Sequence, residues 1–570
     1  MSSEVNKTGS WRFLRPRYDE KTAPCGAACP AGEDIARIEM LTAQGQFKDA
    51  WELILRENPF PGVCGRVCYH PCEVVCNRRE YDEAVGIHIV ERFLADQSPQ
   101  YGPAAGLDRG EARRERLAVV GAGPAGLSAA YFLAVLGYRV DVFEAAPEPG
   151  GLLRWGIPRY RLAQAAVAAE IQRIQSLGVT IHTGRRIPGD FLGRAAETHD
   201  GVFLATGHCA SLKLGIPGAE LSGVEDGMGF LRGMTVGEPE PLEGEVAVIG
   251  GGNSAVDVAR TVARLGARPV IIYRRRRQDM PAFAEEVDMA LEEGARLLEL
   301  RSPVRIERDG PGLLLTVREM AVEGEDAGGR ARVEPHPDRQ ETIPVTRVFV
   351  AIGQEAEEAW MNPPQPGDGY SVYDNSSMLL TARGFPVVRG GDLVNDVKNI
   401  TRAIASGKEG AMALDMLFRR GPESVGSRLN ECRVGNGRCL SMEIYRSGAR
   451  AARSRHVVEY KEINVDYFRF LPRIVQPRLL KAERTSSFAE IDLRISASLA
   501  MREADRCFNC GICNQCDNCR LFCPDLAVAH EPSPRGRAIN YDYCKGCGVC
   551  VVECPRNAMS LTQEKVGEAG

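Results

Sequence analysis

The sequence predicts a multidomain protein that combines an α-helical domain, two α/β domains and a small α+β domain. Three observations lead to this fold class. Six cysteines lie at short intervals between residues 25 and 76, and ten of the 19 cysteines lie between residues 507 and 554. Between these groups, two glycine-rich motifs each follow an apolar strand and precede a helix-like run. A chain of 570 residues has room for about four domains of ordinary size.

Composition and charge narrow the class of protein. With 44% hydrophobic and 26% charged residues the chain is ordinary globular protein, and its net charge of -5 argues against a nucleic-acid partner. The most apolar region, residues 117–143, is interrupted by glycines and charged residues, and the N-terminus lacks an apolar signal core. We therefore expect a cytoplasmic protein with no membrane partner. Cysteines in short-spaced groups of an unexported chain are typical of metal ligands, not of disulfides.

The N-terminal part is predicted to be a polar arm, residues 1–24, followed by a helical cysteine-rich domain, residues 25–104. Spacings of four separate most of its cysteines, which places successive thiols on one face of a helix or on neighbouring loop turns. Both geometries suit a metal. Buried free thiols are the alternative, and six in so short a span are uncommon. The candidate ligands are Cys25, Cys29, Cys64, Cys68, Cys72 and Cys76.

The first glycine motif has the context of a dinucleotide-binding Rossmann fingerprint. A strand at 117–120 leads into G-x-G-x-x-G and a helix, and a second strand at 139–143 ends at an acidic residue. The first glycine permits the tight turn, the second lets the backbone approach a pyrophosphate, and the third allows helix and strand to pack closely. The helix N-terminus attracts phosphates, and the acid can accept from a ribose hydroxyl. The residues expected to bind are Gly121, Gly123, Pro124, Ala125, Gly126 and Glu144.

A second copy of this motif follows at residues 246–273, and its second strand ends in four arginines instead of an acid. Guanidinium groups at that place can hold a 2′-phosphate, which favours NADPH over NADH. A solvated turn is the alternative, and we expect one or two of the four arginines to face solvent. The residues expected to bind are Gly250, Gly252, Asn253, Ser254, Arg274 and Arg275.

One acid-ended and one arginine-ended fingerprint predict FAD in the first site and NADP, or NAD, in the second. The motifs at residues 121–127, 149–153, 155–158, 250–257 and 391–392 resemble the glutamate synthase small-subunit family. That family includes the flavin-bearing half of dihydropyrimidine dehydrogenase and the large subunit of ferredoxin:NADP transhydrogenases, and the resemblance spans about residues 25–418. It implies a nested arrangement, with an FAD domain at 105–241 and 354–420 and an inserted NAD(P) domain at 242–353.

The same resemblance implies further flavin contacts. These residues are Gly151, Leu152, Arg161, Thr206, Gly207, Gly391 and Asp392, with Asp392 bonded to the ribityl or phosphate region. Disulfide reductases carry a redox cysteine pair beside the flavin, whereas this chain reads Leu-Leu-Arg-Trp at 152–155, and Cys209 is a single cysteine. Electrons are therefore expected to leave through iron–sulfur clusters.

Matching the N-terminal cysteines to the family gives one 4Fe–4S cluster. Its ligands would be Cys29, Cys68, Cys72 and a non-cysteine ligand at Glu91, for which a plain surface carboxylate is the alternative. Cys25, Cys64 and Cys76 are then left over. Relatives with two clusters have a further cysteine pair upstream of the position of Cys25, and this chain has none there. A second N-terminal cluster stays open.

The C-terminal residues 506–570 are predicted to form an α+β bacterial-type ferredoxin domain with two 4Fe–4S clusters. The phrase C-x2-C-x2-C-x3-C-P occurs twice, and the fourth cysteine of each run crosses to the other cluster. A zinc ribbon, the alternative, uses separated C-x2-C knuckles. Cys507 and Cys510 precede the first run as spare thiols or as a further site. The expected ligand sets are Cys513, Cys516, Cys519, Cys554 and Cys544, Cys547, Cys550, Cys523.

The C-terminal domain also resembles the ferredoxin subunit of 2-oxoacid:ferredoxin oxidoreductases. The preceding residues 421–505 are interpreted as a basic linker, which would be either a docking surface or a solvated face. Taken together, these motifs predict an electron-transfer subunit that exchanges hydride between NAD(P)(H) and FAD. It would exchange single electrons with an iron–sulfur enzyme or ferredoxin. The favoured partner is a multi-subunit 2-oxoacid oxidoreductase complex. No side-chain acid or base is nominated. The alternatives are the electron-donating small subunit of a glutamate synthase and a non-catalytic adaptor, and both fingerprints are intact.

Overall fold

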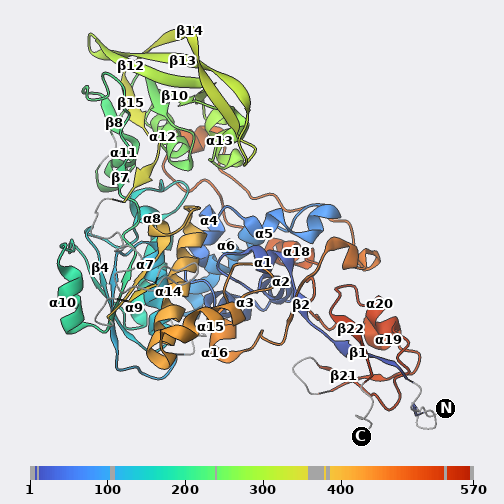
Figure 1. Ribbon diagram of the computed structural model, residues 1–570. Helices are drawn as coiled ribbons and strands as arrows, with labels where there is room; N and C mark the ends of the chain where they lie inside the picture. The colour runs from blue at the N-terminus through green and yellow to red at the C-terminus, as the bar shows by residue number, and fades with distance from the viewer. Residues whose placement is uncertain are drawn as a thin grey trace.

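The computed structural model describes residues 7–8, 12–102, 109–237, 240–356, 378–380, 385–531 and 536–564. Residues 1–6 of the predicted arm, 357–377 of the second FAD-domain segment and 565–570 of the predicted ferredoxin domain lie outside the described residues. Figure 1 shows four parts, with the NAD(P)-type α/β domain above, the FAD-type domain and the N-terminal helices below it, and a small C-terminal domain at the lower right.

Six short helices build the N-terminal domain. Three of them begin with proline, which removes an amide that the first turn does not need and ends the preceding helix. The cysteines therefore do not share one long helix: Cys29 and Cys68 are the residues that end two of these helices. The helices are α1 (Pro24–Ala28), α2 (Ile35–Ala43), α3 (Phe47–Leu55), α4 (Pro61–Val67), α5 (Pro71–Val74) and α6 (Ile87–Gln97).

The first α/β domain has a six-stranded sheet in the order β17-β18-β6-β3-β4-β5, parallel except for β17. Two helices, α7 (Pro124–Val135) and α14 (Ile400–Arg420), pack against each other beside it. Because α7 is buried on nearly all sides, its sequence is apolar throughout. The strands are β3 (Arg116–Val120), β4 (Arg139–Phe143), β5 (Thr180–His182), β6 (Gly201–Leu204), β17 (Met378–Leu380) and β18 (Pro386–Arg389).

The second α/β domain is inserted into the first. Its parallel sheet has the order β11-β10-β9-β15-β8, and a three-stranded antiparallel sheet, β12-β13-β14, packs on it. Since β8 belongs to this sheet, the domain takes in residues that precede the expected boundary at 242. The strands are β8 (Val224–Asp226), β9 (Glu245–Ile249), β10 (Arg268–Tyr273), β11 (Arg296–Glu299), β12 (Arg301–Asp309), β13 (Gly312–Glu325), β14 (Ala331–Val345) and β15 (Arg347–Val350).

The chain enters and leaves this inserted domain through two adjacent segments. β7 (Ala210–Ser211) and β16 (Gln354–Glu355) form a two-stranded antiparallel sheet. Helices α12 (Asn253–Arg264) and α13 (Ala284–Glu292) flank the parallel sheet, and α11 (Gly227–Val236) lies beside α12. The inserted domain is thus joined to the first by two hydrogen-bonded strands, not by a single segment.

The small C-terminal domain includes part of the predicted arm. β1 (Leu14–Tyr18) pairs antiparallel with β22 (Met559–Gln563), so the two ends of the chain share a sheet (Figure 1). β2 (Lys21–Thr22) then pairs with β19 (Ser454–Val457) of the linker. The other elements of the domain are α19 (Asn518–Leu521), β20 (Val528–His530), β21 (Arg537–Ile539) and α20 (Val549–Val552), preceded by α18 (Ala497–Asp505). The arm is an integral strand because it satisfies an otherwise open sheet edge.

The linker is largely packed against other domains. It contains α15 (Val425–Glu431), α16 (Met442–Ser447) and α17 (Lys481–Thr485). Arg450 and Arg453, two of its basic residues, are held in ion pairs with Glu57 and Asp34 of the N-terminal domain. These two arginines therefore do not form the free docking surface that the sequence suggested. In the part of the chain that is described, no helix has the length and apolar character needed to cross a membrane.

Candidate functional site

The first fingerprint forms a tight strand–turn–helix junction. Gly121 has φ +99°, and a Cβ there would stand 2.4 Å from the carbonyl oxygen of Ala205. Gly126 lies against the same turn, with an added Cβ only 1.9 Å from the Gly121 oxygen. Gly151 (φ +53°) closes in on Gly123, whose Cα would be 2.7 Å from a Cβ at position 151. Only glycines let these backbones approach, which leaves the start of α7, at Pro124 and Ala125, open for a pyrophosphate.

Glu144 stands directly after β4 with its carboxylate already oriented. One oxygen accepts from the Ala122 N–H at 2.7 Å, and the other accepts from the Ala146 N–H at 2.8 Å. This fixes the acid next to the glycine turn, at the position where the fingerprint predicts contact with a ribose. Both acceptor bonds also tie the glycine turn to the loop after β4.

The predicted residues from the C-terminal half of the FAD domain come to the same place. Gly391 (φ +68°) donates its N–H to Ser406 Oγ at 2.9 Å, and an added Cβ would be 2.8 Å from that of Ala125. Asp392 follows, and burial raises the pKa of its carboxyl. The structure thus brings Gly121, Gly123, Pro124, Ala125, Gly126, Glu144, Gly151, Leu152, Thr206, Gly207, Gly391 and Asp392 around one edge of the sheet.

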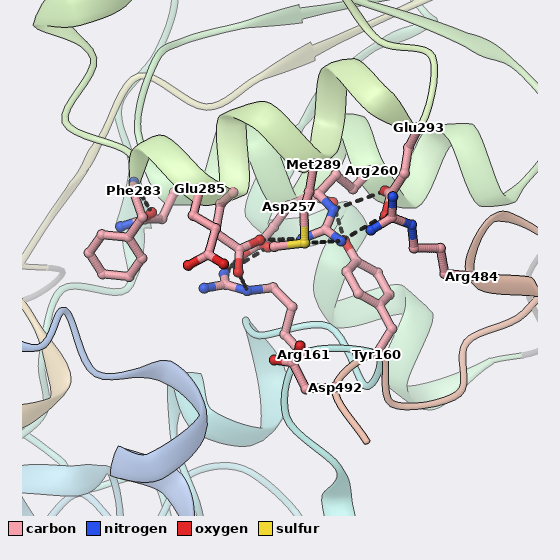
Figure 2. Close-up of polar contacts among 12 residues, drawn as sticks. Tyr160, Arg161, Asp257, Arg260, Phe283, Glu285, Met289, Glu293, Arg484 and Asp492 are labelled. Atoms are coloured by element: carbon pink, nitrogen blue, oxygen red, sulfur yellow. Dashed lines mark hydrogen bonds and ion pairs between the residues drawn. The ribbon is translucent and has the colours of Figure 1, made fainter. Parts of the chain in front are cut away.

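Arg161 is a predicted flavin residue whose side chain is bound to two carboxylates. Its guanidinium donates to both carboxylate oxygens of Asp257 at 2.8 Å, and its Nε lies 2.9 Å from Glu286 (Figure 2). Asp257 belongs to α12 and Glu286 to α13, so Arg161 joins the FAD domain to the inserted domain. The guanidinium is shared by two carboxylates of the inserted domain, and a contact between Arg161 and the flavin stays a prediction.

The second fingerprint has the same open turn. Gly250 has φ +143°, and a Cβ there would be 2.2 Å from the Ala351 oxygen, whereas Gly252 has no atom within 4 Å of an added Cβ. The space beside Gly252 is therefore free for a pyrophosphate. Asn253 does not point outward: its Oδ1 accepts from the Phe283 N–H at 3.0 Å. Ser254 follows it in the first turn of α12.

The four arginines after β10 separate into two pairs. Arg276 is bound to Asp279 at 2.7 Å and to Glu325 at 3.0 Å, and Arg277 is paired with Asp288. Arg275 donates through Nε to the Ala331 carbonyl at 2.9 Å. Arg274 is exposed, and its side chain has no partner among the described residues. Arg274 is thus the guanidinium best placed to receive a 2′-phosphate, with Arg275 beside it.

We expect Arg274→Ala to raise KM for NADPH by roughly 10- to 100-fold and to leave KM for NADH unchanged, because a charge-assisted bond is worth about 1.5–3 kcal/mol. Steady-state kinetics with both nucleotides measure this. Arg277→Ala is the matched control, since it removes an equally exposed arginine that already has a carboxylate partner. An equal rise for NADH, or an effect of Arg277→Ala as large as that of Arg274→Ala, would contradict the assignment.

The cysteines of the small domain gather in two groups. One cavity is lined by Cys513, Cys516, Cys519 and Cys554, and a second by Cys523, Cys544, Cys547 and Cys550. Each group is one of the two predicted ligand sets. Two backbone amides already donate to these sulfurs: Ala527 N–H to Cys523 at 3.3 Å and Ala558 N–H to Cys554 at 3.3 Å. Such N–H···S bonds tune the potential of a cluster held by thiolates, so the residues present fit 4Fe–4S clusters.

The N-terminal cysteines divide differently from the sequence-based assignment. Burial raises the pKa of the Cys72 thiol, and the neighbouring Cys29 and Cys68 add to this. Cys64, expected to be left over, has Cys68 and Glu91 as neighbours, so four cysteines lie together here. Glu91 is buried, not a surface carboxylate, and accepts from Asn58 Nδ2 at 3.1 Å. Cys25 and Cys76 line a cavity of their own with other residues.

Known proteins share these parts. Residues 115–374 match the pyridine nucleotide-disulphide oxidoreductase family, residues 18–102 match dihydropyrimidine dehydrogenase domain II (4Fe-4S cluster), and residues 537–560 match the 4Fe-4S binding domain. The chain is 34% identical over 519 residues to the NADP(+)-dependent formate dehydrogenase subunit beta of Moorella thermoacetica, covering 86% of this chain and 70% of that protein.

Two further relatives have a similar sequence identity to this chain. The NADPH-Fe(3+) oxidoreductase subunit beta of Geobacter sulfurreducens is 32% identical over 518 residues, covering 86% of this chain and 75% of that protein. The glutamate synthase (NADPH) small chain of Halomonas elongata is 32% identical over 396 residues, covering 65% of this chain and 84% of that protein. Together with the two nucleotide fingerprints and the cysteine groups, these matches show that the chain belongs to the family of FAD- and NADP-dependent iron–sulfur oxidoreductases that includes the glutamate synthase small chain.

Proposed function

We propose that the chain is the electron-transfer subunit of a complex in which it exchanges hydride with NADP(H) and single electrons with an iron–sulfur partner, a 2-oxoacid:acceptor oxidoreductase. When bound, FAD and the nicotinamide supply the hydride exchange, and the clusters carry single electrons. The residues of this chain bind and orient these groups. No side-chain acid or base is required, which agrees with the polar residues of the fingerprints being used for binding.

The observation that carries this proposal is the succession of cysteine groups from the FAD domain to the molecular surface. Cys68 Sγ lies 3.5 Å from Thr401 Oγ1, and Thr401 is in the first turn of α14, the helix packed on α7. At the other end, Cys516 and Cys547 of the small domain are exposed. Electrons that leave the FAD domain therefore have a path whose last members are open to a partner.

Apolar side chains surround that exit and support a protein partner. Leu521 and Phe522 at α19 are 68% and 48% exposed, and Leu526 and Val552 are 74% and 70% exposed. α19 and α20 pack together, so Leu521 and Val552 lie on neighbouring helices of the small domain. Apolar groups gathered on a surface mark interaction sites more often than they occur by chance. A partner that binds here would lie against the exposed clusters.

A 2-oxoacid oxidoreductase is preferred because residues 518–525 and 541–550 resemble the ferredoxin subunit of such enzymes. In that complex a 2-oxoacid and coenzyme A are oxidised to acyl-coenzyme A and CO2, and the two electrons reduce NADP+ to NADPH. The second candidate is the electron-donating subunit of a glutamate synthase, which the 32% identity over 396 residues to a glutamate synthase small chain favours. That enzyme class oxidises NADPH instead.

Anaerobic purification of the tagged chain with its partners from its own host tests the two candidates. NADP+ reduction that requires both a 2-oxoacid and coenzyme A would support the first. NADPH oxidation that requires glutamine and 2-oxoglutarate would replace it by the second. Adding NADPH to the isolated, FAD- and iron-loaded chain tests the common part, and we expect loss of flavin absorbance followed by cluster signals in electron paramagnetic resonance. No loss of flavin absorbance would overturn it.

A further inference from the structure

Four cysteines from the two ends of the chain meet around one small cavity. It is lined by Cys25 and Cys76 of the N-terminal domain and by Cys507 and Cys510, which follow α18 near the start of the small domain. The rest of its wall is formed by apolar side chains, among them Phe508, and by the polar residues Glu39, Asn77 and Arg78. All four are free cysteines and none is exposed. The site is separate from the three cysteine groups described above, because it shares no cysteine with them.

The Cys507–Cys510 loop has the backbone of the ligand loops that follow it. In each of three C-x2-C loops the residue before the second cysteine has positive φ: Asn509 +49°, Gln515 +62° and Gly546 +70°. A positive φ at Asn or Gln is uncommon and costs free energy, so it indicates a backbone held for a purpose. In each loop the N–H of that same residue is bonded to the sulfur of the first cysteine, at 3.3 Å from Asn509 to Cys507, and likewise for Cys513 and Cys544.

Further polar groups are directed at these sulfurs. Asn77 Nδ2 lies 3.5 Å from Cys510 Sγ while also donating to the Val458 carbonyl at 2.9 Å. Burial raises the pKa of the Cys25 thiol well above its ordinary value, and the Cys507, Cys76 and Cys510 thiols raise it further. Four thiols in one buried place are therefore costly to ionise without a cation, and a bound metal centre would supply the positive charge.

We propose that Cys25, Cys76, Cys507 and Cys510 hold a further 4Fe–4S cluster, assembled from both ends of the chain. The ligand loop matches those of the ferredoxin-type groups in φ and in its N–H···S bond, and the four thiols enclose one cavity. Cys507 and Cys510 are therefore ligands, not spare thiols.

The position of this site makes it the link between the two halves of the electron path. Cys25 and Cys29 lie one turn apart at α1, and they face different cysteine groups. On the other side, the Arg556 guanidinium has both Cys507 and Cys510 and the ferredoxin-type ligands Cys516 and Cys554 as charged neighbours. Electrons pass singly through the site between the flavin and the small-domain clusters. In the direction proposed above, two electrons from the partner reduce NADP+ to NADPH; in the reverse direction, which the test uses, one NADPH delivers two electrons that leave to an external one-electron acceptor. This relay role depends on the proposed function, whereas the presence of the cluster does not.

The test compares Cys507→Ala/Cys510→Ala with Cys432→Ala in the full chain, purified without oxygen. Cys432 is a buried thiol that follows α15 of the linker, packs in the hydrophobic core shared with the FAD domain and belongs to none of the cysteine groups. We expect the double variant to lose about four iron and four sulfide per chain, as one cubane requires. Its FAD content and its rate of flavin reduction by NADPH stay unchanged, while reduction of the small-domain clusters by NADPH is lost. We expect Cys432→Ala to keep the iron, sulfide and FAD contents, the rate of flavin reduction and the reduction of the small-domain clusters.

A third variant distinguishes loss of the cluster from misfolding of the double variant. Cys76→Ala alters the site from the N-terminal domain, and it must give the same loss of iron as the double variant. Unchanged iron in either variant would overturn the proposal, as would a zinc ion in the parent protein that disappears in the variants without loss of iron. If iron falls as expected but reduction of the small-domain clusters persists, the relay role is wrong and the cluster site stands.

Discussion

Replacing Gly126 with alanine is expected to abolish FAD binding. The added methyl group would stand 1.9 Å from the carbonyl oxygen of Gly121 and 3.2 Å from Val119 Cγ1. Both atoms belong to β3 and its turn, so α7 must move away from the sheet to relieve the clash. Overpacking of this kind costs about 1–3 kcal/mol or more. It also displaces the helix N-terminus that would receive the pyrophosphate.

The ratio of flavin absorbance to protein in the purified variant measures this effect. We expect less than about one tenth of the parent FAD content, and with it the loss of NADPH-driven cluster reduction, because a displaced helix N-terminus no longer presents its amides to the phosphates. Gly193→Ala is the matched control, since Gly193 lies in α10 (Phe191–Thr198) of the same domain and no atom comes within 4 Å of an added Cβ. Full FAD content in Gly126→Ala would show that α7 does not hold the flavin as described.

Replacing Glu57 with alanine is expected to lower the free energy of unfolding by roughly 3–5 kcal/mol. Glu57 joins the N-terminal domain, the FAD domain and the linker. Glu57 is 1% exposed and pairs with Lys408 of α14 at 2.7 Å and with Arg450 of the linker. It also accepts from the Met442 N–H at 2.8 Å. Removing the carboxylate leaves the buried Lys408 without its ion-pair partner and Arg450 with Glu443 alone among the described residues, and that uncompensated burial is what costs free energy.

The midpoint of thermal unfolding, followed by circular dichroism, checks this prediction. The double variant Glu57→Ala/Lys408→Met should recover part of the lost stability, because it replaces the cation that has lost its carboxylate partner with an apolar side chain. Glu52→Ala serves as the surface control: its partner Lys48 is exposed, and such pairs contribute about 0–1 kcal/mol. A shift for Glu57→Ala no larger than that for Glu52→Ala would refute the role of this pair.

Sequence reasoning worked where a function depends on residues close together in the chain. Each glycine fingerprint, with its strands and its acid or arginines, lies within about 30 residues, so spacing alone identifies the turn and the helix N-terminus. The two C-terminal cysteine sets are also local, since loops of two residues place three thiols around one centre. The structure adds which arginines are paired: Arg276 and Arg277 have carboxylate partners, and Arg274 has none within the described part of the chain.

Sequence reasoning missed contacts that join distant parts of the chain. The carboxylate partners of Arg161, namely Asp257 and Glu286, come from the inserted domain, and this contact has no signal in the local spacing because the packing of one domain on another decides it. Cys64 is a different case. The sequence-based assignment sets it aside with Cys25 and Cys76, although its four-residue spacing to Cys68 already places the two thiols one turn apart at α4.

The sequence by itself determined the kind of chemistry, namely two nucleotide sites and iron–sulfur ligands, because each depends on a short motif whose geometry the local backbone dictates. Only the tertiary structure decided which cysteines from distant parts of the chain lie together. Cys25 and Cys507 are separated by most of the chain, and they meet because β1 pairs with β22 and β2 with β19, which brings the two ends together. Pairing of distant segments follows from burial and from sheet edges that must be filled, and no spacing rule encodes it.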